Sequence, residues 1–479
     1  MRYEIIIIGG GLGGLTAGAK LAREGKSVLL IEQHSIPGGC ATTFRRHDFT
    51  LEVGLHEMDG PAPRDMKNRI FTELGVFDNV EFVRVPEFYH FVNDNIKITI
   101  PHDPLAATAV LKENFPEETS GIDTYFNQIL NPKRKTPAGE TPEDQSVGEF
   151  LDSIIADSDL KLVLLGNLGY FHDDPYSLSL AYYSVAQGSY YNSGASFIKG
   201  GSQKLSDHLA EYIRKHGGEV VLDHLVTGFL TDNNLLTGVT FRQMKEGSDI
   251  QKAFASEIIA NAALPLIADM LPEIYAGVLK NEIRNQKTGA SLLSIYFGFR
   301  HNLKSIGHNH YSTFYFDNSI KSPGDIFKNN NSGFRNRSFT FIDYGQIDSG
   351  LAPKGKSVGA ICCIDYTSGW EHLSRAAYLS KKKEVAEIFI TRLEKYIPGI
   401  KDEIEYSETG TPLTVKRYTL NPGGAVYGFA QTPGRAALDT SKLPDNLHIA
   451  SAWGKTGGGF SGAIYGGYLC AYNILRKKN

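Results

Sequence analysis

Apolar runs alternate with a glycine-rich turn at the start of the chain. Ile5–Ile8 is an unbroken run of β-branched residues, which predicts a strand buried on both faces. Small and apolar positions after the turn indicate a helix that packs on a sheet: Leu15, Ala19, Leu21 and Ala22. Ser27–Ile31 is a second apolar run, and it ends at the acid Glu32. The pattern predicts a strand–helix–strand unit.

The glycines of this unit have the spacing G-x-G-x-x-G. Gly9 permits a tight turn, Gly11 lets a pyrophosphate approach the backbone, and Gly14 lets the helix pack closely on its strand. Glu32 lies 18 residues after Gly14, where a carboxylate accepts hydrogen bonds from a ribose. The unit therefore predicts a dinucleotide site, but it does not choose between FAD and NAD.

Two further glycine-rich segments favour a flavin. The pair at 38–39 offers a second bare stretch of backbone directly after the acid. The run 446–475 predicts a strand, a glycine cluster and a helix. Gly457, Gly459 and Gly462 repeat the G-x-G-x-x-G spacing, but no second strand and no acid follow them. We expect this turn to direct the positive end of its helix at a flavin ring, whose N1–C2=O edge becomes negative on reduction.

Other patterns predict further elements. Ala255–Leu264 predicts a strand, and the polar run Asn131–Ser146 predicts an exposed loop. A helix is expected before the stop signal Gly217–Gly218. Its apolar face consists of Leu205, Leu209, Tyr212 and Ile213.

Motifs along nearly the whole chain resemble the phytoene desaturase superfamily of FAD proteins. They are the N-terminal unit with its glycine pair, the segment 200–229, and the glycine-rich run 457–471. VLLIEQHSIPGGCATTF, EVGLHEMDG, and ENFPEE followed by IDTYF look most like the branch of retinol saturases and carotenoid isomerases. The resemblance implies an α/β fold, with a Rossmann-like FAD-binding domain of non-contiguous segments and an inserted α+β substrate domain. The implied FAD-binding segments are 1–65, 196–269 and 411–479, and the substrate-domain segments are 66–195 and 270–410.

The resemblance also implies which residues contact non-covalent FAD. Val226 falls on a strand that passes the adenine and holds it by backbone contacts. The candidate FAD-binding residues are Gly9, Gly11, Gly14, Glu32, Gln33, Gly38, Gly39, Val226, Trp453, Gly459, Ser461, Gly462 and Ala463.

A flavin exchanges a hydride, so the protein must also manage a proton. In the family the loop 54–57 runs beside the flavin, which makes His56 and Glu57 candidates for this role; the alternative is that they only form loop hydrogen bonds. Tyr427 lies in the segment that closes over the ring in the family, where lining the wall is favoured over donating a proton. The histidines and cysteines lack metal-ligand spacing, so no metal site is expected.

Aromatic and apolar clusters leave two alternatives each. Tyr182, Tyr183, Tyr190 and Tyr191 either wall a tunnel for a flat apolar molecule or belong to the ordinary core. The run Leu264–Lys280 is either a membrane-facing helix or a helix packed in the core. Its apolar positions are Leu264, Ile267, Leu271, Ile274 and Leu279.

Composition narrows the partners. Lys and Arg number 49 against 53 Asp and Glu, which gives a net charge of −4 and argues against a nucleic-acid partner. Four scattered cysteines indicate a reducing compartment. With no signal peptide and no apolar run of the roughly 18 residues that a spanning helix needs, we expect a cytoplasmic protein that can contact a membrane from one side.

These features together predict an FAD-dependent oxidoreductase acting on carbon–carbon double bonds of an apolar isoprenoid or polyene. Saturation, as in retinol saturase, is the first choice, and desaturation or cis–trans isomerisation are alternatives. NAD(P)H is left open as a diffusible electron donor. A binding protein resembling GDP dissociation inhibitor, with a prenyl lipid and no redox chemistry, is the alternative of another class. An amine oxidase relative is a third, although the Cys that tethers flavin after Ser-Gly-Gly is missing. The sequence does not indicate an oligomeric state.

Overall fold

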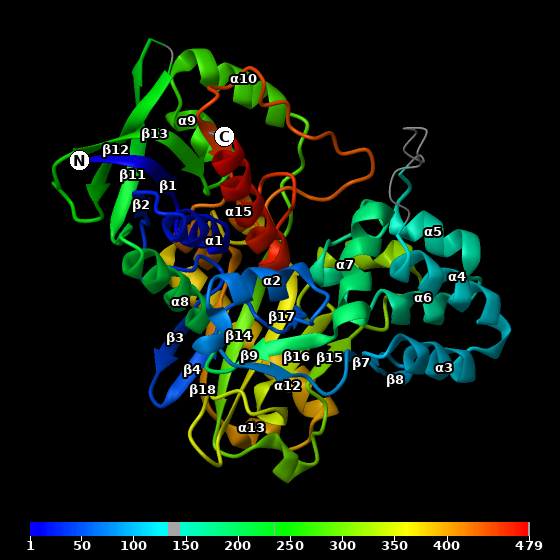
Figure 1. Ribbon diagram of the computed structural model, residues 1–479. Helices are drawn as coiled ribbons and strands as arrows, with labels where there is room; N and C mark the ends of the chain where they lie inside the picture. Colours follow the sequence, from blue (N-terminus) through cyan, green and yellow to red (C-terminus); the bar gives the residue numbers. More distant parts are fainter. Residues whose placement is uncertain (133–143, 234, 478–479) are drawn as a thin grey trace.

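The computed structural model describes residues 1–132, 144–233 and 235–477, and two seven-stranded sheets form its framework (Figure 1). The expected loop Asn131–Ser146 includes residues 133–143, which lie outside the described residues. No helix in the described ranges has the length and apolar character needed to cross a membrane. The fold is α/β, as the sequence predicts.

The first sheet has the strand order β10-β2-β1-β13-β12-β11. β1 pairs in parallel with β2 and β13, and β13 pairs with antiparallel β12 along its first half and with parallel β19 near its end. These strands come from three separate parts of the chain, while the domain boundaries between them stay a prediction. The bounds are β1 Arg2–Ile8, β2 Val28–Ile31, β10 Glu219–Val221, β11 His224–Asp232, β12 Leu235–Gln243, β13 Gln251–Ala260 and β19 Leu447–Ile449.

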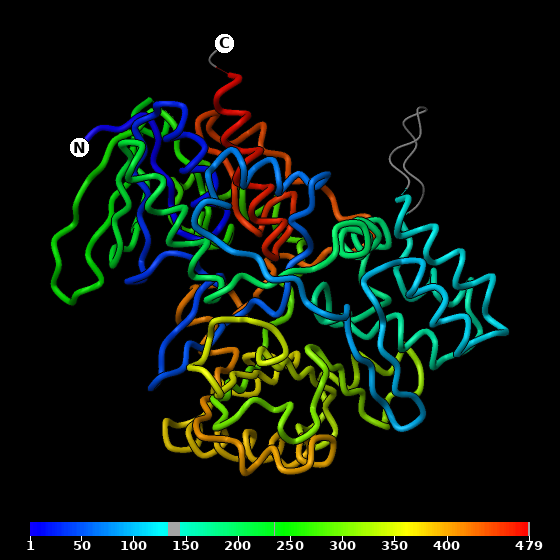
Figure 2. Tube along the Cα trace, turned by 60° about the horizontal axis from the view of Figure 1, so that its bottom comes forward, coloured from blue at the N-terminus to red at the C-terminus, as the bar shows by residue number. Residues whose placement is uncertain are grey.

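Side chains of β1 are buried on both faces of the first sheet, as its unbroken apolar run predicts. Ile5 and Ile7 pack in one core with α1, α8 and α15, while Ile6 and Ile8 pack in another with β12 and α9. Figure 2 shows the red C-terminal helix beside the blue N-terminal segment, and α15 packs directly on α1. The helices are α1 Leu12–Arg23, α8 Gln203–Lys215, α9 Leu264–Met270, α10 Glu273–Ile283 and α15 Gly459–Arg476.

The second sheet has the order β18-β14-β17-β16-β15-β7-β8 and is antiparallel except between β15 and β7. Helix α12 packs on one of its faces. The bounds are β7 Tyr89–Val92, β8 Lys97–Ile100, β14 Ser291–Phe299, β15 Ser312–Tyr315, β16 Phe339–Asp343, β17 Ser357–Asp365, β18 Ile404–Gly410, α11 Ile326–Asn330, α12 Arg375–Tyr396, α13 Ile400–Glu403 and α14 Pro412–Thr419.

Helices α3–α7 form a lobe beside β8, the edge strand of the second sheet, and its neighbour β7 (Figure 1). Two small sheets, β3-β4 and β5-β9-β6, complete the fold. The bounds are α2 Met66–Glu73, α3 Pro104–Asn114, α4 Thr119–Leu130, α5 Val147–Ile154, α6 Ser158–Leu164, α7 Leu180–Ser193, β3 Thr43–Arg46, β4 Phe49–Glu52, β5 Met58–Asp59, β6 Phe82–Arg84 and β9 Ala195–Ile198.

The expected helix before Gly217–Gly218 is confirmed as α8. The expected strand at Ala255–Leu264 is confirmed for residues 255–260, which belong to β13, but it ends at Ala260 and Leu264 begins α9. The run Leu264–Lys280 forms two helices, with Pro272 between them. A membrane-facing surface on this run is wrong for four of its five apolar positions, because Leu264, Ile267, Leu271 and Leu279 are buried and only Ile274 is exposed. The alternative, packing in the core, is confirmed for those four.

Candidate functional site

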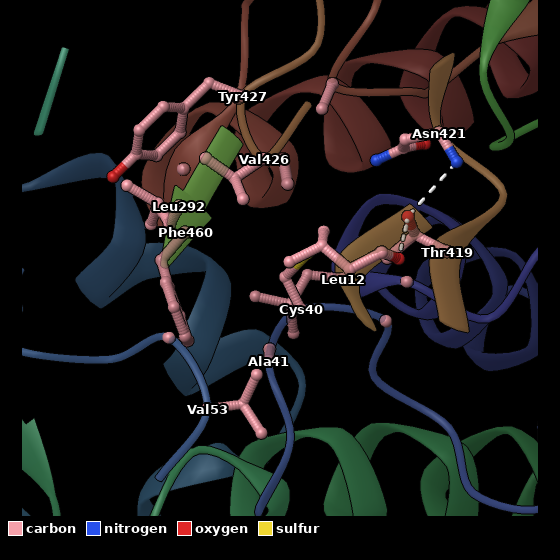
Figure 3. Close-up of a pocket in the computed structure, with 18 of the residues that line it drawn as sticks. Leu12, Cys40, Ala41, Val53, Leu292, Thr419, Asn421, Val426, Tyr427 and Phe460 are labelled. Atoms are coloured by element: carbon pink, nitrogen blue, oxygen red, sulfur yellow. Dashed lines mark hydrogen bonds between the residues drawn. The ribbon is translucent and has the colours of Figure 1, made fainter. Parts of the chain in front are cut away.

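A cavity of about 1050 Å³ lies between the two sheets and helix α7. Small-molecule sites usually have roughly 300–1,000 Å³, so this cavity has room for a large cofactor together with a substrate. Figure 3 shows part of its wall: Leu12 and Cys40 approach from the N-terminal segments, while Tyr427 and Phe460 approach from the C-terminal ones.

Glycine loops form one end of the cavity. The N–H of Gly38 donates to the Gly10 carbonyl at 2.7 Å, which joins the second loop to the first. Asn261 Nδ2 donates to the Gly9 carbonyl at 3.0 Å and holds the first turn on β13. Gly14 does not border the cavity; a Cβ there would lie 2.3 Å from the Gly9 oxygen, so this glycine allows close packing of α1. The predicted glycines that border the cavity are Gly9, Gly11, Gly38 and Gly39.

Glu32 lies at the end of β2 and borders the cavity. Its Oε2 accepts a hydrogen bond from Gly10 N at 2.6 Å, and its Oε1 accepts one from His34 N at 2.8 Å. Burial raises the pKa of Glu32 more than the two hydrogen bonds lower it, so the net shift of the pKa is upward. Each carboxylate oxygen can accept a second hydrogen bond, so ribose hydroxyls can still bind. Gln33 also borders the cavity, and its Nε2 donates to the Tyr418 carbonyl.

The turn before α15 forms the opposite wall. Gly459 has a φ of +74°, and a Cβ on it would meet no protein atom within 4 Å, so its backbone is bare toward the cavity. A Cβ on Gly458 would lie 2.5 Å from the Tyr427 carbonyl oxygen, which packs the two segments together. Trp453 is buried edge-on against Phe429. The remaining predicted residues Val226, Trp453, Ser461, Gly462 and Ala463 border the same cavity.

His56 and Glu57 both border the cavity. Glu57 is 6% exposed, and neither of its carboxylate oxygens has a hydrogen-bond partner among the described residues. Burial, and then the neighbouring Glu87 carboxylate, raise the pKa of Glu57 well above its ordinary value, which favours the protonated acid. Burial lowers the pKa of His56 to about 4, which leaves it neutral. The Glu57 side chain therefore makes none of the loop hydrogen bonds that would give it a merely structural role.

Aromatic side chains form the far end of the cavity. Of the four predicted tyrosines, Tyr182 and Tyr190 border it, whereas Tyr183 and Tyr191 are buried in the core of the helical lobe. The Tyr183 hydroxyl bonds to that of Tyr125 at 2.8 Å. The tunnel interpretation therefore fits one tyrosine of each pair. Tyr427 borders the cavity as well, where burial raises its pKa, so it is a poor proton donor and suits the lining role.

The sequence did not indicate three residues near this cavity. Tyr170 borders it with a buried hydroxyl that has no partner among the described residues, and its ring centroid lies 5.7 Å from that of His56. Asp59 also borders it, and it forms an ion pair with the buried Lys67. Asp59 lies within the EVGLHEMDG motif, but one acid in a motif does not show that a buried lysine opposes it. In the described ranges, no group of three His, Cys, Asp or Glu could hold a metal ion.

Comparison with known proteins places this site in a family. Residues 12–475 match the family described as flavin containing amine oxidoreductase. The chain belongs to this family. A flavin is accordingly the cofactor of this oxidoreductase family, whose curated relatives include both isomerases and reductases.

Curated relatives of this flavin oxidoreductase span nearly its whole length. The chloroplastic prolycopene isomerase of Daucus carota is 26% identical over 99% of this chain and 80% of its own. The all-trans-retinol 13,14-reductase of Homo sapiens is 24% identical over 99% of this chain and 86% of its own. The resemblance to the carotenoid isomerase and retinol saturase branch is thus confirmed.

Solved structures confirm the fold. An oxidoreductase from Methanosarcina mazei has a TM-score of 0.68 at 15% identity, covering 99% of this chain and 100% of its own. Putrescine oxidase bound to putrescine has a TM-score of 0.65 at 14% identity, covering 99% of both chains. At such identities the likeness concerns the fold alone.

The residues present fit a flavin dinucleotide. Cβ atoms are missing where a pyrophosphate would approach Gly11 and where a ring would approach Gly459. Glu32 is positioned by two backbone N–H groups at the end of β2, where a ribose would lie. Between the glycine loops and the C-terminal turn the cavity is continuous. The family's cofactor therefore suits this site.

Proposed function

We propose that this protein is an FAD-dependent oxidoreductase that acts on carbon–carbon double bonds of a long apolar isoprenoid or polyene, and that it saturates them. One observation carries the proposal: a single cavity joins the glycine loops to a wall of aromatic rings. Such a wall suits a flat conjugated chain, because aromatic faces stack on planar apolar molecules. The retinol reductase and prolycopene isomerase relatives, whose names refer to polyenes, support this substrate class.

Glu57 is the residue that we assign to the proton. When bound, the flavin supplies or accepts a hydride. A double bond that gains a hydride on one carbon needs a proton on the other, and Glu57 is an acid bordering the cavity whose pKa burial raises well above its ordinary value. His56, which burial keeps neutral, carries no positive charge that would favour the ionised form of Glu57.

Four alternatives differ in what they do with the same cavity. Desaturation reverses the hydride and proton transfers, and isomerisation has no net transfer. A lipid-binding protein without redox chemistry, resembling GDP dissociation inhibitor, is disfavoured by the family match and the bare glycine turns. An amine oxidase activity is the fourth alternative, and the aromatic rings alone do not exclude it, because such rings also bind ammonium groups.

The electron donor and the substrate source belong to the same proposal. We propose NAD(P)H as a diffusible donor that reaches the flavin without a second nucleotide-binding domain. An isoprenoid is almost insoluble in water, so we propose that the protein collects it by reversible contact with a bilayer surface.

A purified, flavin-loaded protein tests the reaction. It is reduced anaerobically by NADPH or dithionite and then mixed with all-trans-retinol or prolycopene, and the products are analysed by mass. A product with two added hydrogen atoms supports saturation. A product with two fewer hydrogen atoms than the substrate, formed with the oxidised protein, would show desaturation. A product of unchanged mass with an altered chromatographic retention time would show isomerisation. A colourless protein that cannot be loaded with FAD would contradict the flavin proposal.

A further inference from the structure

A buried lysine holds together two acids beneath the start of α15. Lys67 is 0% exposed, and its Nζ lies 2.7 Å from Asp59 Oδ2 and 2.7 Å from Asp65 Oδ2. It also donates to the Tyr465 hydroxyl at 2.9 Å. Asp65 accepts the N–H of Lys67 at the start of α2 and the hydroxyl of Tyr465 from α15. Two carboxylates against one ammonium leave this Asp59–Lys67–Asp65 cluster with one net negative charge.

Asp59 is the member of the cluster that borders the cavity. Its two oxygens accept hydrogen bonds from the hydroxyls of Ser461, in the first turn of α15, and Ser189, on α7. Burial raises the pKa of Asp59, but the Lys67 ammonium and these hydroxyls more than offset this, so the net shift is downward and Asp59 is ionised. Burial, and then the Asp59 charge, raise the pKa of Tyr182 to about 12, so this charge acts on the cavity wall.

We propose that Asp59, with Lys67 as its counter-charge, is a positioning and charge-setting residue that makes the bound flavin a stronger reductant. This inference rests on the proposed function, in which the α15 turn faces the flavin ring. The positive end of α15 favours electron uptake by that ring. The Asp59 carboxylate lies at the same turn and opposes this effect, because a negative neighbour disfavours added negative charge. A flavin that gives up electrons readily suits saturation better than desaturation.

The two partners have opposite charges, which gives a sign test. Asp59→Asn removes a negative charge and should make the midpoint potential more positive. Lys67→Met removes the positive charge and should make the midpoint potential more negative when it is measured at a pH high enough to keep Asp59 ionised without this counter-charge. Each shift should correspond to about a tenfold change in the ratio of reduced to oxidised flavin, or about 30 mV for a two-electron couple. The potentials are measured on flavin-loaded protein by dye equilibration, so activity is not needed for the readout.

Glu73→Gln is the matched control. Glu73 also lies on α2, pairs with Lys20 at 2.6 Å and accepts a hydroxyl from α15 at 2.6 Å, but it does not border the cavity. Its potential should equal that of the wild type. If Lys67→Met does not fold, Asp59→Asn alone decides, since it keeps the size and planar shape of the side chain.

Shifts of opposite sign, or a positive shift of Asp59→Asn where only that variant folds, support the inference. Equal potentials in all variants, or shifts of one sign in both, would overturn it while leaving a flavoprotein intact. A wild-type protein that takes up no flavin would overturn the proposed function and this inference together.

Discussion

Three buried glutamates line or adjoin the cavity, and their partners separate their roles. Glu32 accepts two backbone N–H groups. Glu52 accepts the N–H and the hydroxyl of Ser202, both at 2.7 Å, and so links β4 to α8. The Glu57 carboxylate has no hydrogen-bond partner among the described residues. Burying a polar group without hydrogen bonds is costly, so Glu57 is explained best by function. The sequence identifies all three as Glu but cannot show how each is bonded.

Stability should depend on pH through Glu57. Its pKa is raised in the folded state above the ordinary value of 4.5. Its stabilising contribution is therefore fully present below about 4.5 and is lost as the pH rises toward the folded pKa, because the unfolded chain ionises first. Glu57→Gln removes this loss. We expect the thermal midpoint of the variant to exceed that of the wild type increasingly as the pH is raised from 5 to 9.

Glu52→Gln provides the comparison for that measurement. Glu52 accepts hydrogen bonds from Ser202 and from Leu55 N, so its amide variant should be less stable than the wild type at pH 5. Burial also raises the pKa of Glu52, so this deficit should narrow as the pH rises, whereas Glu57→Gln should have no deficit to begin with. If the stability of Glu57→Gln had the same pH dependence as that of the wild type, Glu57 would be ionised in the folded protein. The proton role proposed for it would then fail as well.

At the scale of elements, residues close together in the sequence predict where helices and strands begin and end, but they do not predict which surface each element packs against. The β1–α1–β2 unit and the end of α8 follow from periodicity and glycine positions within a few residues. The run Leu264–Lys280 was ambiguous, because an apolar helix face looks the same whether a bilayer or β12 covers it. Tyr182 and Tyr183 are adjacent, yet only the fold decides that the first borders the cavity and the second faces the lobe.

The glycine turn at the start of α15 gives a prediction at this scale. Gly459 and Gly307 both have positive φ, +74° and +85°, and a Cβ on either would meet nothing within 4 Å. Alanine at either position should cost about 1 kcal/mol of stability from backbone strain. Of the two, only Gly459 borders the cavity. Gly459→Ala should therefore retain less flavin on gel filtration, whereas Gly307→Ala should retain as much as the wild type. Equal retention in both would place this turn away from the cofactor.

At the scale of the whole molecule, the arrangement of the strands explains why the sequence does not predict the cavity wall. Its wall combines residues as far apart as Gly9 and Gly459, brought together because β13 pairs with both β1 and β19. Motifs mark the glycine loops, which resemble those of other proteins. No sequence motif indicates the Asp59–Lys67 ion pair or the unpaired Tyr170 hydroxyl, because both arise from packing between segments. The sequence therefore predicts the fold and the class of cofactor, but it does not predict the buried charges and hydroxyl groups around the cavity.

Supply of an apolar substrate from a bilayer is tested on the same scale. The net charge of −4 provides no general attraction to anionic lipid, so binding should depend on apolar contact and change little with salt. Val185, on α7, is 61% exposed and borders the cavity near Tyr182. We expect the protein to float with liposomes at low and high salt, and Val185→Asp to weaken that flotation.

Ile274 offers the matched comparison, since it is 62% exposed but does not border the cavity. Ile274→Asp should float as the wild type does, because both variants add the same charge and only Val185→Asp adds it at the border of the cavity. An equal loss of flotation in the two variants would indicate that apolar contact with the bilayer is spread over the surface and is not confined to the border of the cavity. A wild type that stays in the soluble fraction at both salt concentrations, with retinol in the lipid, would rule out delivery from the bilayer. The aromatic wall would then have to receive its substrate from water or from a carrier protein.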